Sequence, residues 1–324
     1  MREQLEIVAV PRRLATLSAK SPVLFLPNAK AAERFFEFFT VNIRNKNTRR
    51  AYYKAVCRFS EWCEGWGLAD LARVKPVHVA AYIESLGRDL AKPSVKQHLA
   101  AVRMLLDWLV IGHVLDANPA HAVRGPKHVV KKGRTPVLTS DEARAMLAAI
   151  DPGSLTGLRD RALIGMMIYT FARIGAVLQM NVGDYFTQGR RGWVRLHEKG
   201  GKEHDAPCHH KLEASLDAYL EAAGIGADLE GALFRTTGRT TGTPNRMGQS
   251  DAYRMIQRRA RQAGIETKIG NHSMRATGIT DYLKNSGTLE HAQQMANHSS
   301  PRTTKLYDRR NDEVALEEYE RVGI

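Results

Sequence analysis

A basic stretch near the middle of the chain, residues 124–136, divides the sequence into two parts. It holds two prolines, two glycines and five lysines or arginines, and its apolar residues follow no period. Prolines and glycines stop helices and strands, so such a segment is typical of an extended linker. We therefore predict folded domains at residues 28–123 and 137–324, joined by this linker, with residues 1–27 as an N-terminal extension.

The net charge indicates a polyanionic partner. The 324 residues include 48 Lys and Arg against 34 Asp and Glu, a formal charge of +14. This balance is typical of proteins that bind nucleic acid or an acidic membrane surface. No apolar run approaches the roughly 20 residues of a membrane span, so nucleic acid is the favoured partner. The three cysteines form no CxxC pair, which favours a reduced, cytoplasmic protein.

The first domain has a helical pattern throughout. Four phenylalanines between positions 35 and 39 form the apolar face of a first helix that begins near Ala29. Three more helices are expected, each with an opening and a closing signal. These signals are Asn47 and Thr48 with Gly65, Pro76 with Gly87, and Pro93 and Ser94 with Gly112. Four helices with short connections predict a compact helical domain.

Basic residues of this domain gather at the start of its second helix and along its fourth. Helix N-termini and cations together suit phosphate contacts. A solvated surface position is an equally good interpretation for any single lysine, but the cluster as a whole favours DNA. The predicted DNA-contact residues are Arg49, Arg50, Lys54, Lys92, Lys96 and Arg103, Lys131 and Lys132 in the linker, and Lys202 in the second domain.

The second domain opens with a capping box of Thr139 and Glu142. A strongly apolar helix at residues 158–171 is followed almost at once by Arg173. A desolvated arginine needs an anionic partner, so a structural salt bridge and a substrate phosphate compete for Arg173. Residues 192–207 alternate as a hairpin. Its turn, Gly200 and Gly201, has Lys199 and Lys202 at its shoulders, and helices are predicted at residues 210–223, 250–263, 274–285, 288–296 and 313–321.

The last third of the chain holds side chains suited to phosphate chemistry. His272 and Arg275 lie three residues apart and share one helix face, and His298 precedes Tyr307 by nine residues. Arginine matches phosphate oxygens with a fixed fork of donors, and histidine moves protons near neutral pH. Another histidine group, His204, His209 and His210, matches no zinc spacing and is interpreted as solvated loop residues.

In sequence order these candidates are Arg173, Lys199, His272, Arg275, His298 and Tyr307, and their pattern resembles the tyrosine recombinase (phage integrase) family. The resemblance covers residues 29–324. It implies a mainly α protein, with a four-helix, SAM-like DNA-binding domain followed by an α+β catalytic domain with a small antiparallel sheet. Three positions depart from the family pattern: Ala176 replaces an acidic residue, Asn297 a glycine and Met274 a leucine.

The resemblance implies the reaction as well. Tyr307 would attack a DNA phosphodiester, two guanidiniums would stabilise the developing charge, and Lys199 would protonate the leaving 5′-hydroxyl. Lys202 competes with Lys199 for this last role. His272 fits an acid/base role and His298 a hydrogen bond to the phosphate. The sequence has no carboxylate cluster for Mg²⁺, and a phosphotyrosine intermediate conserves the bond energy, so neither metal nor ATP is expected as cofactor.

The expected partner is double-stranded DNA with specific recombination sites, bound by a synaptic tetramer. Two other functions share features with this one: a type IB topoisomerase, with the same chemistry, and a non-catalytic DNA-binding regulator with the same fold. The acidic, amphipathic segment from Asp312 to Ile324 is predicted to dock in trans on a neighbouring protomer, with its own catalytic domain as the alternative.

Overall fold

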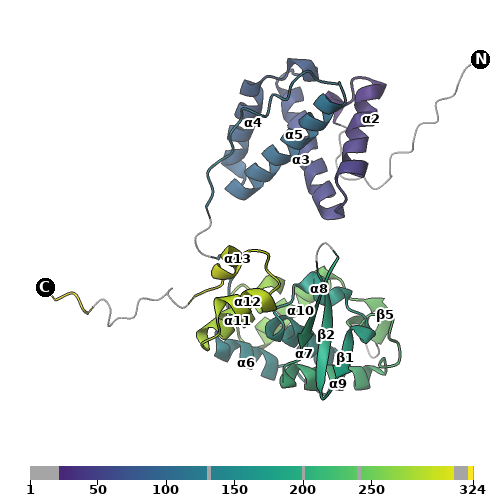
Figure 1. The fold of residues 1–324 in the computed structure, drawn as a ribbon, viewed down its shortest axis with the longest axis vertical. Coiled ribbons are helices and arrows are strands. Elements are labelled where there is room, and N and C mark those ends of the chain that lie inside the picture. The colour runs from purple at the N-terminus through teal and green to yellow at the C-terminus, as the bar shows by residue number, and fades with distance from the viewer. Residues whose placement is uncertain (1–21, 130–132, 199–200, 239–241, 310–319, 324) are drawn as a thin grey trace, which may run out of the picture. The chain divides into compact units, whose positions relative to one another are not determined.

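The structure is a computed structural model that describes residues 22–129, 133–198, 201–238, 242–309 and 320–323. It divides into two compact units, Met1–Val129 and Val130–Ile324 (Figure 1). The division falls within residues 124–136, whose described part has no helix or strand. The domain bounds given above remain predictions.

Unit 1 is helical, and its four longer helices match the four that the sequence predicts. Phenylalanine rings from the first helix and the segment after it form a fully buried core with rings of the second. Phe35 contacts Phe39 edge to face, with 5.1 Å between ring centroids, and Phe39 contacts Tyr53 at 5.4 Å. The helices are α2 (Ala29–Glu37), α3 (Lys46–Gly65), α4 (Pro76–Asp89) and α5 (Lys92–Ile111), with short turns η1 (Val23–Phe25), η2 (Phe38–Asn42) and η3 (Leu71–Arg73).

Two of the predicted helix ends in unit 1 were wrong. The cap of α3 is the side chain of Asn45, which accepts hydrogen bonds from the backbone N–H groups of Asn47 and Thr48 at 3.0 and 3.1 Å. Helix α4 does not end at Gly87, because a glycine within a helix costs only about 1 kcal/mol. The helix continues to Asp89, and the Leu90 N–H bonds to the Leu86 carbonyl at 2.9 Å.

Unit 2 packs helices around a small antiparallel sheet, as the sequence predicts. Its helices are α6 (Ser140–Ala148), α7 (Leu155–Tyr169), α8 (Ile174–Gln179), α9 (His210–Ala223), α10 (Gln249–Gln262), α11 (Asn271–Lys284), α12 (Leu289–Met295) and α13 (Pro301–Lys305), with a short turn η4 (Val182–Asp184). Its strands are β1 (Tyr185–Gln188), β2 (Arg191–Glu198), β3 (Lys202–Pro207), β4 (Arg235–Thr237) and β5 (Gly242–Arg246). The predicted capping box of α6 is confirmed, because Thr139 and Glu142 bond to each other's backbone N–H groups at 2.8 and 3.1 Å.

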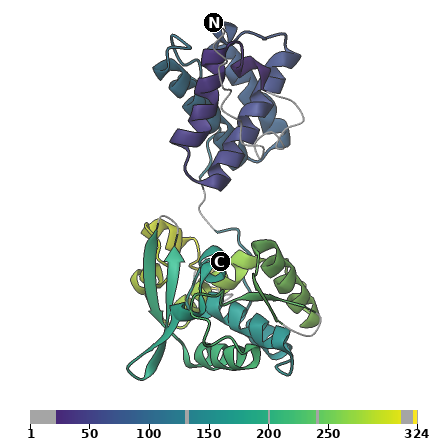
Figure 2. The ribbon, with the colours of Figure 1, turned by 90° about the vertical axis from the view of Figure 1, so that its right-hand side faces the viewer.

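The larger sheet has the order β1-β2-β3, and Figure 2 shows it on one side of unit 2. The predicted hairpin is confirmed as β2 and β3, paired from Trp193 opposite Pro207 to Glu198 opposite Lys202. The predicted two-residue turn between Lys199 and Lys202 was wrong, because Lys202 pairs with Glu198 and three residues, 199–201, separate the paired positions. The residues of β2 alternate between a buried and an outer face. Strand β1 was not predicted because it has only four residues, and the β4-β5 hairpin was not predicted because its strands are short and polar.

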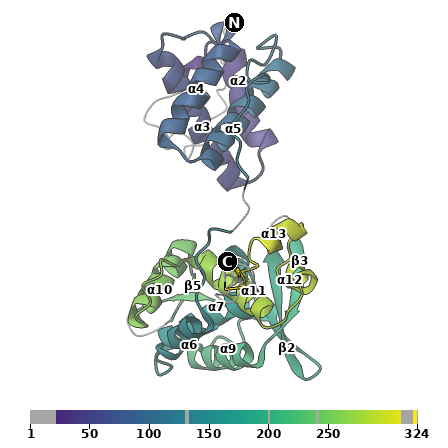
Figure 3. The ribbon, with the colours of Figure 1, turned by 90° about the vertical axis from the view of Figure 1, so that its left-hand side faces the viewer.

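The core of unit 2 is built on α7, which lies beside α9 and α11 (Figure 3). Helices α7 and α11 come very close at Gly278, where a Cβ atom would lie 2.1 Å from the carbonyl oxygen of Ile168. This close approach holds the first turn of α11, which carries His272 and Arg275, next to the chain that leaves α7. None of the described helices has both the length and the apolar character of a membrane span.

Candidate active site

Unit 2 brings five of the six candidate side chains into one cluster. Arg173 precedes α8, His272 and Arg275 lie in the first turn of α11, His298 follows α12, and Tyr307 follows α13. Side-chain contacts join Arg275, His298 and Tyr307, and the charge of Arg173 acts on Arg275 and His272. Lys199 lies outside the described residues, as do Lys131 and Lys132.

Arg275 lies at the centre of the cluster and is 2% exposed. Its Nη1 donates to the carbonyl oxygen of Phe171, and its Nη2 donates to the carbonyl oxygen of Ala296 at 2.6 Å and contacts Nε2 of His298 at 2.7 Å. Burial and the positive charge of Arg173 lower the pKa of Arg275 to about 10, against the opposing effects of Tyr307 and Glu198. The guanidinium therefore remains a cation near neutral pH, preorganised by three acceptors.

The ring of His298 is held from both sides. Its Nε2 faces Arg275, and its Nδ1 lies 2.9 Å from the hydroxyl of Thr304, which is fully buried. A guanidinium has only donors, so Nε2 accepts and the ring proton of the neutral imidazole is on Nδ1, donated to Thr304. Burial and the charges of Arg275 and Arg173 lower the pKa of His298 to about 4. His298 is consequently neutral at pH 7.

Two residues beside this cluster adopt left-handed backbone conformations. Asn297, directly before His298, has φ of 46°, and Phe171, whose carbonyl accepts from Arg275, has φ of 55°. Asparagine tolerates this region better than most residues with a side chain, which explains why it occurs where the family usually has glycine. A bulky residue such as phenylalanine does not, so Phe171 is a strained position at the site.

Tyr307 is half-buried and stacks on His298, with ring centroids 5.7 Å apart and an angle of 10° between the planes. Its backbone is anchored at both ends, because its N–H donates to the Thr304 carbonyl at 2.9 Å and its carbonyl accepts from the Thr280 hydroxyl at 3.1 Å. A hydrogen bond with the Tyr307 side chain also contributes to the pKa of Arg275. The phenol ring is thus placed against the two most buried members of the cluster.

His272 is exposed and follows Asn271, the first residue of α11. Partial desolvation, and then the positive charges of Arg275 and Arg173, lower the pKa of its imidazole. A neutral imidazole near pH 7 is able to accept a proton, which suits the acid/base role that the sequence suggested.

From its sequence position, Arg173 could form a structural salt bridge or bind a substrate phosphate. Its Nη1 donates to Oε2 of Glu198 at 2.6 Å, and its side chain is still 38% exposed, whereas that of Glu198 is only 5% exposed. The salt bridge is therefore real, and it leaves part of the guanidinium open to an incoming anion. The acid that pairs with Arg173 is Glu198 on β2. Position 176 on α8, where the family pattern has an acid, is an alanine.

Two residues of the site, Glu198 and Thr304, were missed by sequence reasoning. Glu198 had a signal: it continues the buried face of β2 after Val194 and Leu196, and a carboxylate at a buried position requires a partner. Thr304 had none, because a hydroxyl three residues before Tyr307 gives no indication that it contacts His298.

The predicted DNA-contact residues differ in their contacts within unit 1 and unit 2. Lys54, Lys92, Lys96, Arg50 and Lys202 are exposed. Two others bind carbonyls of their own unit. Arg49 donates twice to the Ile43 carbonyl, at 3.1 and 2.8 Å, and Arg103 donates to the carbonyls of Ala120 and Val123 at 3.3 and 2.6 Å. DNA contact remains a prediction for all of them, and Arg49 and Arg103 also have a structural function.

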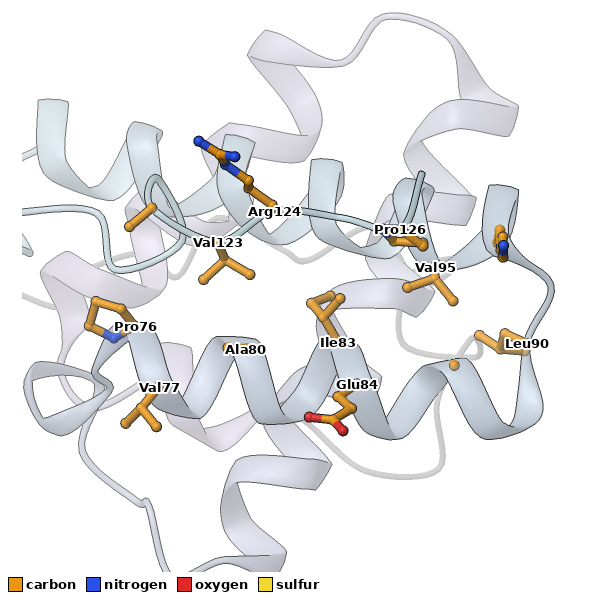
Figure 4. A pocket seen from close by; sticks show the side chains of 13 residues that line it. Pro76, Val77, Ala80, Ile83, Glu84, Leu90, Val95, Val123, Arg124 and Pro126 are labelled. Carbon is orange, nitrogen blue, oxygen red and sulfur yellow. The ribbon is translucent and has the colours of Figure 1, made fainter. Parts of the chain in front are cut away.

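Each unit has a sizeable hollow on its surface. In unit 1 an apolar groove of about 700 Å³ runs between α4 and the segment of Val123, Arg124 and Pro126, with Ile83 among its lining residues (Figure 4). In unit 2 a more polar hollow of about 1040 Å³ adjoins the cluster and is lined by His298 together with parts of β3 and α12. Of these two hollows, the second includes a residue of the candidate active site, His298, among its lining residues.

The histidines outside the cluster do not form a metal site in the described residues, where no group of three or more His, Cys, Asp or Glu side chains is placed to hold an ion. The prediction that His209 is a solvated loop residue was incomplete. Its ring stacks on Tyr169 with 4.4 Å between centroids, and its Nδ1 accepts from the Lys211 N–H at 3.2 Å, which caps α9.

Known proteins resemble this chain along most of its length. It is 29% identical over 280 residues to "Tyrosine recombinase XerD" of Mycobacterium leprae, a match that covers 81% of this chain and 86% of that protein. It is 27% identical over 296 residues to "Tyrosine recombinase XerC" of Vibrio atlanticus, covering 88% and 91%.

Solved structures show the same fold. The XerH site-specific recombinase bound to palindromic difH substrate, a post-cleavage complex, has a TM-score of 0.71 at 18% identity, covering 95% of this chain and 93% of that one. The lambda integrase tetramer bound to a Holliday junction has a TM-score of 0.69 at 17% identity, covering 95% and 84%.

Family models match both units. The model of the N-terminal SAM-like domain of phage integrases matches residues 32–111, and the model of the phage integrase family matches residues 136–314. The second match spans more than half of the chain, and the protein therefore belongs to the phage integrase family, the tyrosine recombinases.

Proposed function

We propose that this protein is a site-specific DNA recombinase that cleaves and rejoins DNA through a 3′-phosphotyrosine intermediate. One observation carries the proposal: the phenol of Tyr307 stacks on His298 beside the buried guanidinium of Arg275. A nucleophile, a cation and a hydrogen-bonding imidazole are thereby held within one cluster, in a chain with a net charge of +14.

In the proposed reaction, the Tyr307 hydroxyl attacks phosphorus. The bond from its oxygen to phosphorus forms while the bond from phosphorus to the 5′ oxygen breaks. Arg275 and the open side of Arg173 bind the non-bridging oxygens, whose charge grows in the transition state. The phenolic proton passes to neutral His272, and the leaving 5′ oxygen takes a proton from Lys199, which follows β2 in the sequence. Rejoining reverses these steps with a 5′-hydroxyl from another strand.

His298 is assigned a contact with the scissile phosphate. In the free protein, Nε2 of His298 accepts a hydrogen bond from Nη2 of Arg275. When a phosphate oxygen accepts from this Nη2 in its place, Nε2 of His298 is no longer occupied. The ring then donates from Nε2 once its proton has moved or a second proton is bound. The Thr304 hydroxyl can donate to Nδ1 as well as accept from it, so its contact with the ring is compatible with both tautomers.

Assembly follows from the same proposal. Exchange of strands between two sites requires four protomers, and we propose a synaptic tetramer on double-stranded DNA. The segment from Asp312 to Ile324 is proposed to dock on a neighbouring protomer. It lies largely outside the described residues, and its acidic side chains would repel DNA. We place the protein in the cytoplasm with the nucleoid, where its substrate lies.

The decisive experiment uses a suicide DNA substrate that traps the covalent adduct. Wild-type protein should form a protein–DNA adduct that excess EDTA does not prevent, because Arg173, Arg275 and Lys199 supply the positive charge. Tyr307→Phe should form none while binding DNA with nearly wild-type affinity. Tyr282→Phe is the matched control, since Tyr282 and Tyr307 pack against the same hydrophobic cluster, which includes Phe171 and Ile279. An adduct in Tyr307→Phe would assign the nucleophile elsewhere, and none in wild type on any DNA would favour a non-catalytic regulator.

A second experiment separates the recombinase from a topoisomerase and tests the tail. A recombinase should exchange strands only between its own sites, whereas a topoisomerase relaxes supercoiled plasmid without regard to sequence. Deletion of residues 313–324 should leave binding to a single site near wild type and weaken synapsis. A truncated protein that still assembles a normal four-protomer complex in light scattering would contradict docking in trans.

A further inference from the structure

We propose that Glu198 is a positioning residue for the cleavage reaction, acting through Arg173, whose guanidinium it aims at the reacting phosphate. This inference rests on the proposed function and adds to it a residue that has no part in the chemistry itself. It starts from a carboxylate that the catalytic steps do not use, although its side chain is 95% buried and contacts one of the two arginines of the site.

The contact between Glu198 and Arg173 has the geometry of a residue that orients the guanidinium. Oε2 of Glu198 lies 2.6 Å from Nη1 of Arg173, a short distance for a charge-assisted hydrogen bond. The arginine side chain is 38% exposed, and among the described residues Glu198 is the acceptor of its side-chain hydrogen bond. A planar guanidinium with one arm fixed has little freedom left, so its remaining donors point in a set direction before DNA arrives.

The position of Glu198 on β2 makes this contact rigid. Glu198 follows Val194 and Leu196 on the buried face of the strand and is paired with Lys202 across the hairpin. A carboxylate at such a position costs free energy unless it is paired, and Arg173 is the partner that compensates it. The sheet therefore fixes the carboxylate, and the carboxylate fixes the arginine.

A second contribution is electrostatic. Arg173 and Arg275 are both cations, and the charge of Arg173 acts on Arg275, His272 and His298. Without DNA, two neighbouring guanidiniums repel each other, and the nearby carboxylate offsets part of that repulsion. Glu198 thus stabilises the arrangement that the phosphate later occupies, at a site where α8 has Ala176 and no acid of its own close to Arg173.

An exposed ion pair of unit 2 offers a matched control. Asp141 and Arg144 on α6 form this pair, and their side chains are 90% and 70% exposed. Asp141→Asn removes a carboxylate from an arginine outside the hollow that His298 lines, and exposed pairs of this kind contribute little to stability.

The test compares Glu198→Gln and Asp141→Asn in single-turnover cleavage by the full chain. Glutamine keeps the size and an acceptor oxygen but removes the charge. We expect Glu198→Gln to cleave about 100-fold more slowly than wild type, the order of loss that a small misplacement causes. Its Kd for DNA should stay within about twofold, and Asp141→Asn should cleave at the wild-type rate. Thermal unfolding of each variant verifies that it is folded.

A second substrate distinguishes action through Arg173 from action through the neighbouring Lys199. When the leaving 5′ oxygen is replaced by sulfur, the leaving thiolate is a weak base and needs no proton donor. A residue that acts through Arg173 remains important on this substrate, because the non-bridging oxygens still gain charge. We therefore expect the Glu198→Gln defect to persist with sulfur.

The outcomes separate the inference from the proposed function. If wild type forms no adduct with either substrate, the proposed function fails. If wild type cleaves and folded Glu198→Gln cleaves at the same rate, the inference is wrong and the function stands. Full recovery of Glu198→Gln on the sulfur substrate also overturns the inference, since it would assign Glu198 to the proton donor.

Discussion

Nε2 of His298 lies 2.7 Å from Nη2 of Arg275, and this contact decides where the imidazole of the free protein carries its proton. The arginine can only donate, so the histidine accepts at Nε2 and donates from Nδ1 to Thr304. A chain of three buried side chains thereby leads from the guanidinium to α13, the helix that precedes Tyr307. Four predictions follow from contacts of this kind.

Removal of the Thr304 hydroxyl should impair cleavage without preventing folding. Thr304→Val keeps the shape of the side chain but leaves the buried Nδ1 of His298 without its partner, at a cost of about 1–3 kcal/mol. We expect a lower melting temperature and a cleavage rate reduced at least tenfold, with DNA affinity little changed. Thr304→Ser keeps the hydroxyl and should recover most of the rate. Equal rates for valine and serine variants would contradict this role.

The stability of unit 2 should fall as the pH is lowered from about 6.5 to about 4. The pKa of His298 is depressed from 6.5 to about 4 in the folded protein, so in this window the unfolded chain binds a proton that the folded protein does not. Stability rises with pH wherever the unfolded state binds more protons. Melting temperatures across the window should show a steeper fall for wild type than for His298→Gln. The lowered pKa of His272 adds a smaller effect of the same sign, common to both proteins.

Asp160 should be essential for the stability of unit 2. Its carboxylate is fully buried and accepts from Arg159 at 2.6 Å, Arg258 at 2.9 Å and Arg259 at 2.7 Å. Asp160→Asn leaves buried guanidinium charge uncompensated, which costs about 3–5 kcal/mol. Urea denaturation of the full chain measures this loss.

The matched control for Asp160 is an exposed pair of the same chemistry. Asp141 and Arg144 are 90% and 70% exposed, and Asp141→Asn should change the free energy of unfolding by less than about 0.5 kcal/mol. A loss below about 1 kcal/mol for Asp160→Asn would show that the three arginines find other acceptors.

Gly133→Ala should displace Tyr307, because Gly133 lies near the start of unit 2 in the sequence but contacts the segment that carries Tyr307. The Gly133 N–H donates to the Leu306 carbonyl at 3.2 Å, and Arg309 donates to the carbonyls of Gly133 and Thr135 at 2.6 and 3.2 Å. A Cβ atom at position 133 would lie 2.3 Å from the Leu306 carbonyl oxygen, so the segment next to the nucleophile has to move. We expect cleavage to slow by about 100-fold with DNA affinity preserved.

Gly125→Ala is the control within the same predicted linker. Its Cβ would meet only side-chain atoms, the nearest 3.3 Å away on Leu99, so cleavage should stay near the wild-type rate. If Gly133→Ala cleaves as fast as Gly125→Ala, the contact between residue 133 and Leu306 does not place the nucleophile.

Much of the architecture could be predicted because its signals are local. The helix openings at Pro76 and Thr139 depend on side chains within one turn, and the β2-β3 hairpin depends on the alternation of its two strands. Gly87 and the cap of α3 were misjudged because several residues at a helix end compete for one role. Strands β4 and β5 were missed because they are polar and short, and β1 because four residues give no clear alternation, so that pairing defines all three.

The sequence by itself determined the helical pattern of each domain, the net charge, and the order and spacing of the candidate residues from Arg173 to Tyr307. Composition and spacing are properties of the chain. Only the tertiary structure decided which atoms meet. It paired Arg173 with Glu198 across 25 positions and placed Thr304 against His298. Whether a buried carboxylate or hydroxyl finds a partner depends on how strands and helices pack, and no local pattern encodes a distance between elements that are far apart in the sequence.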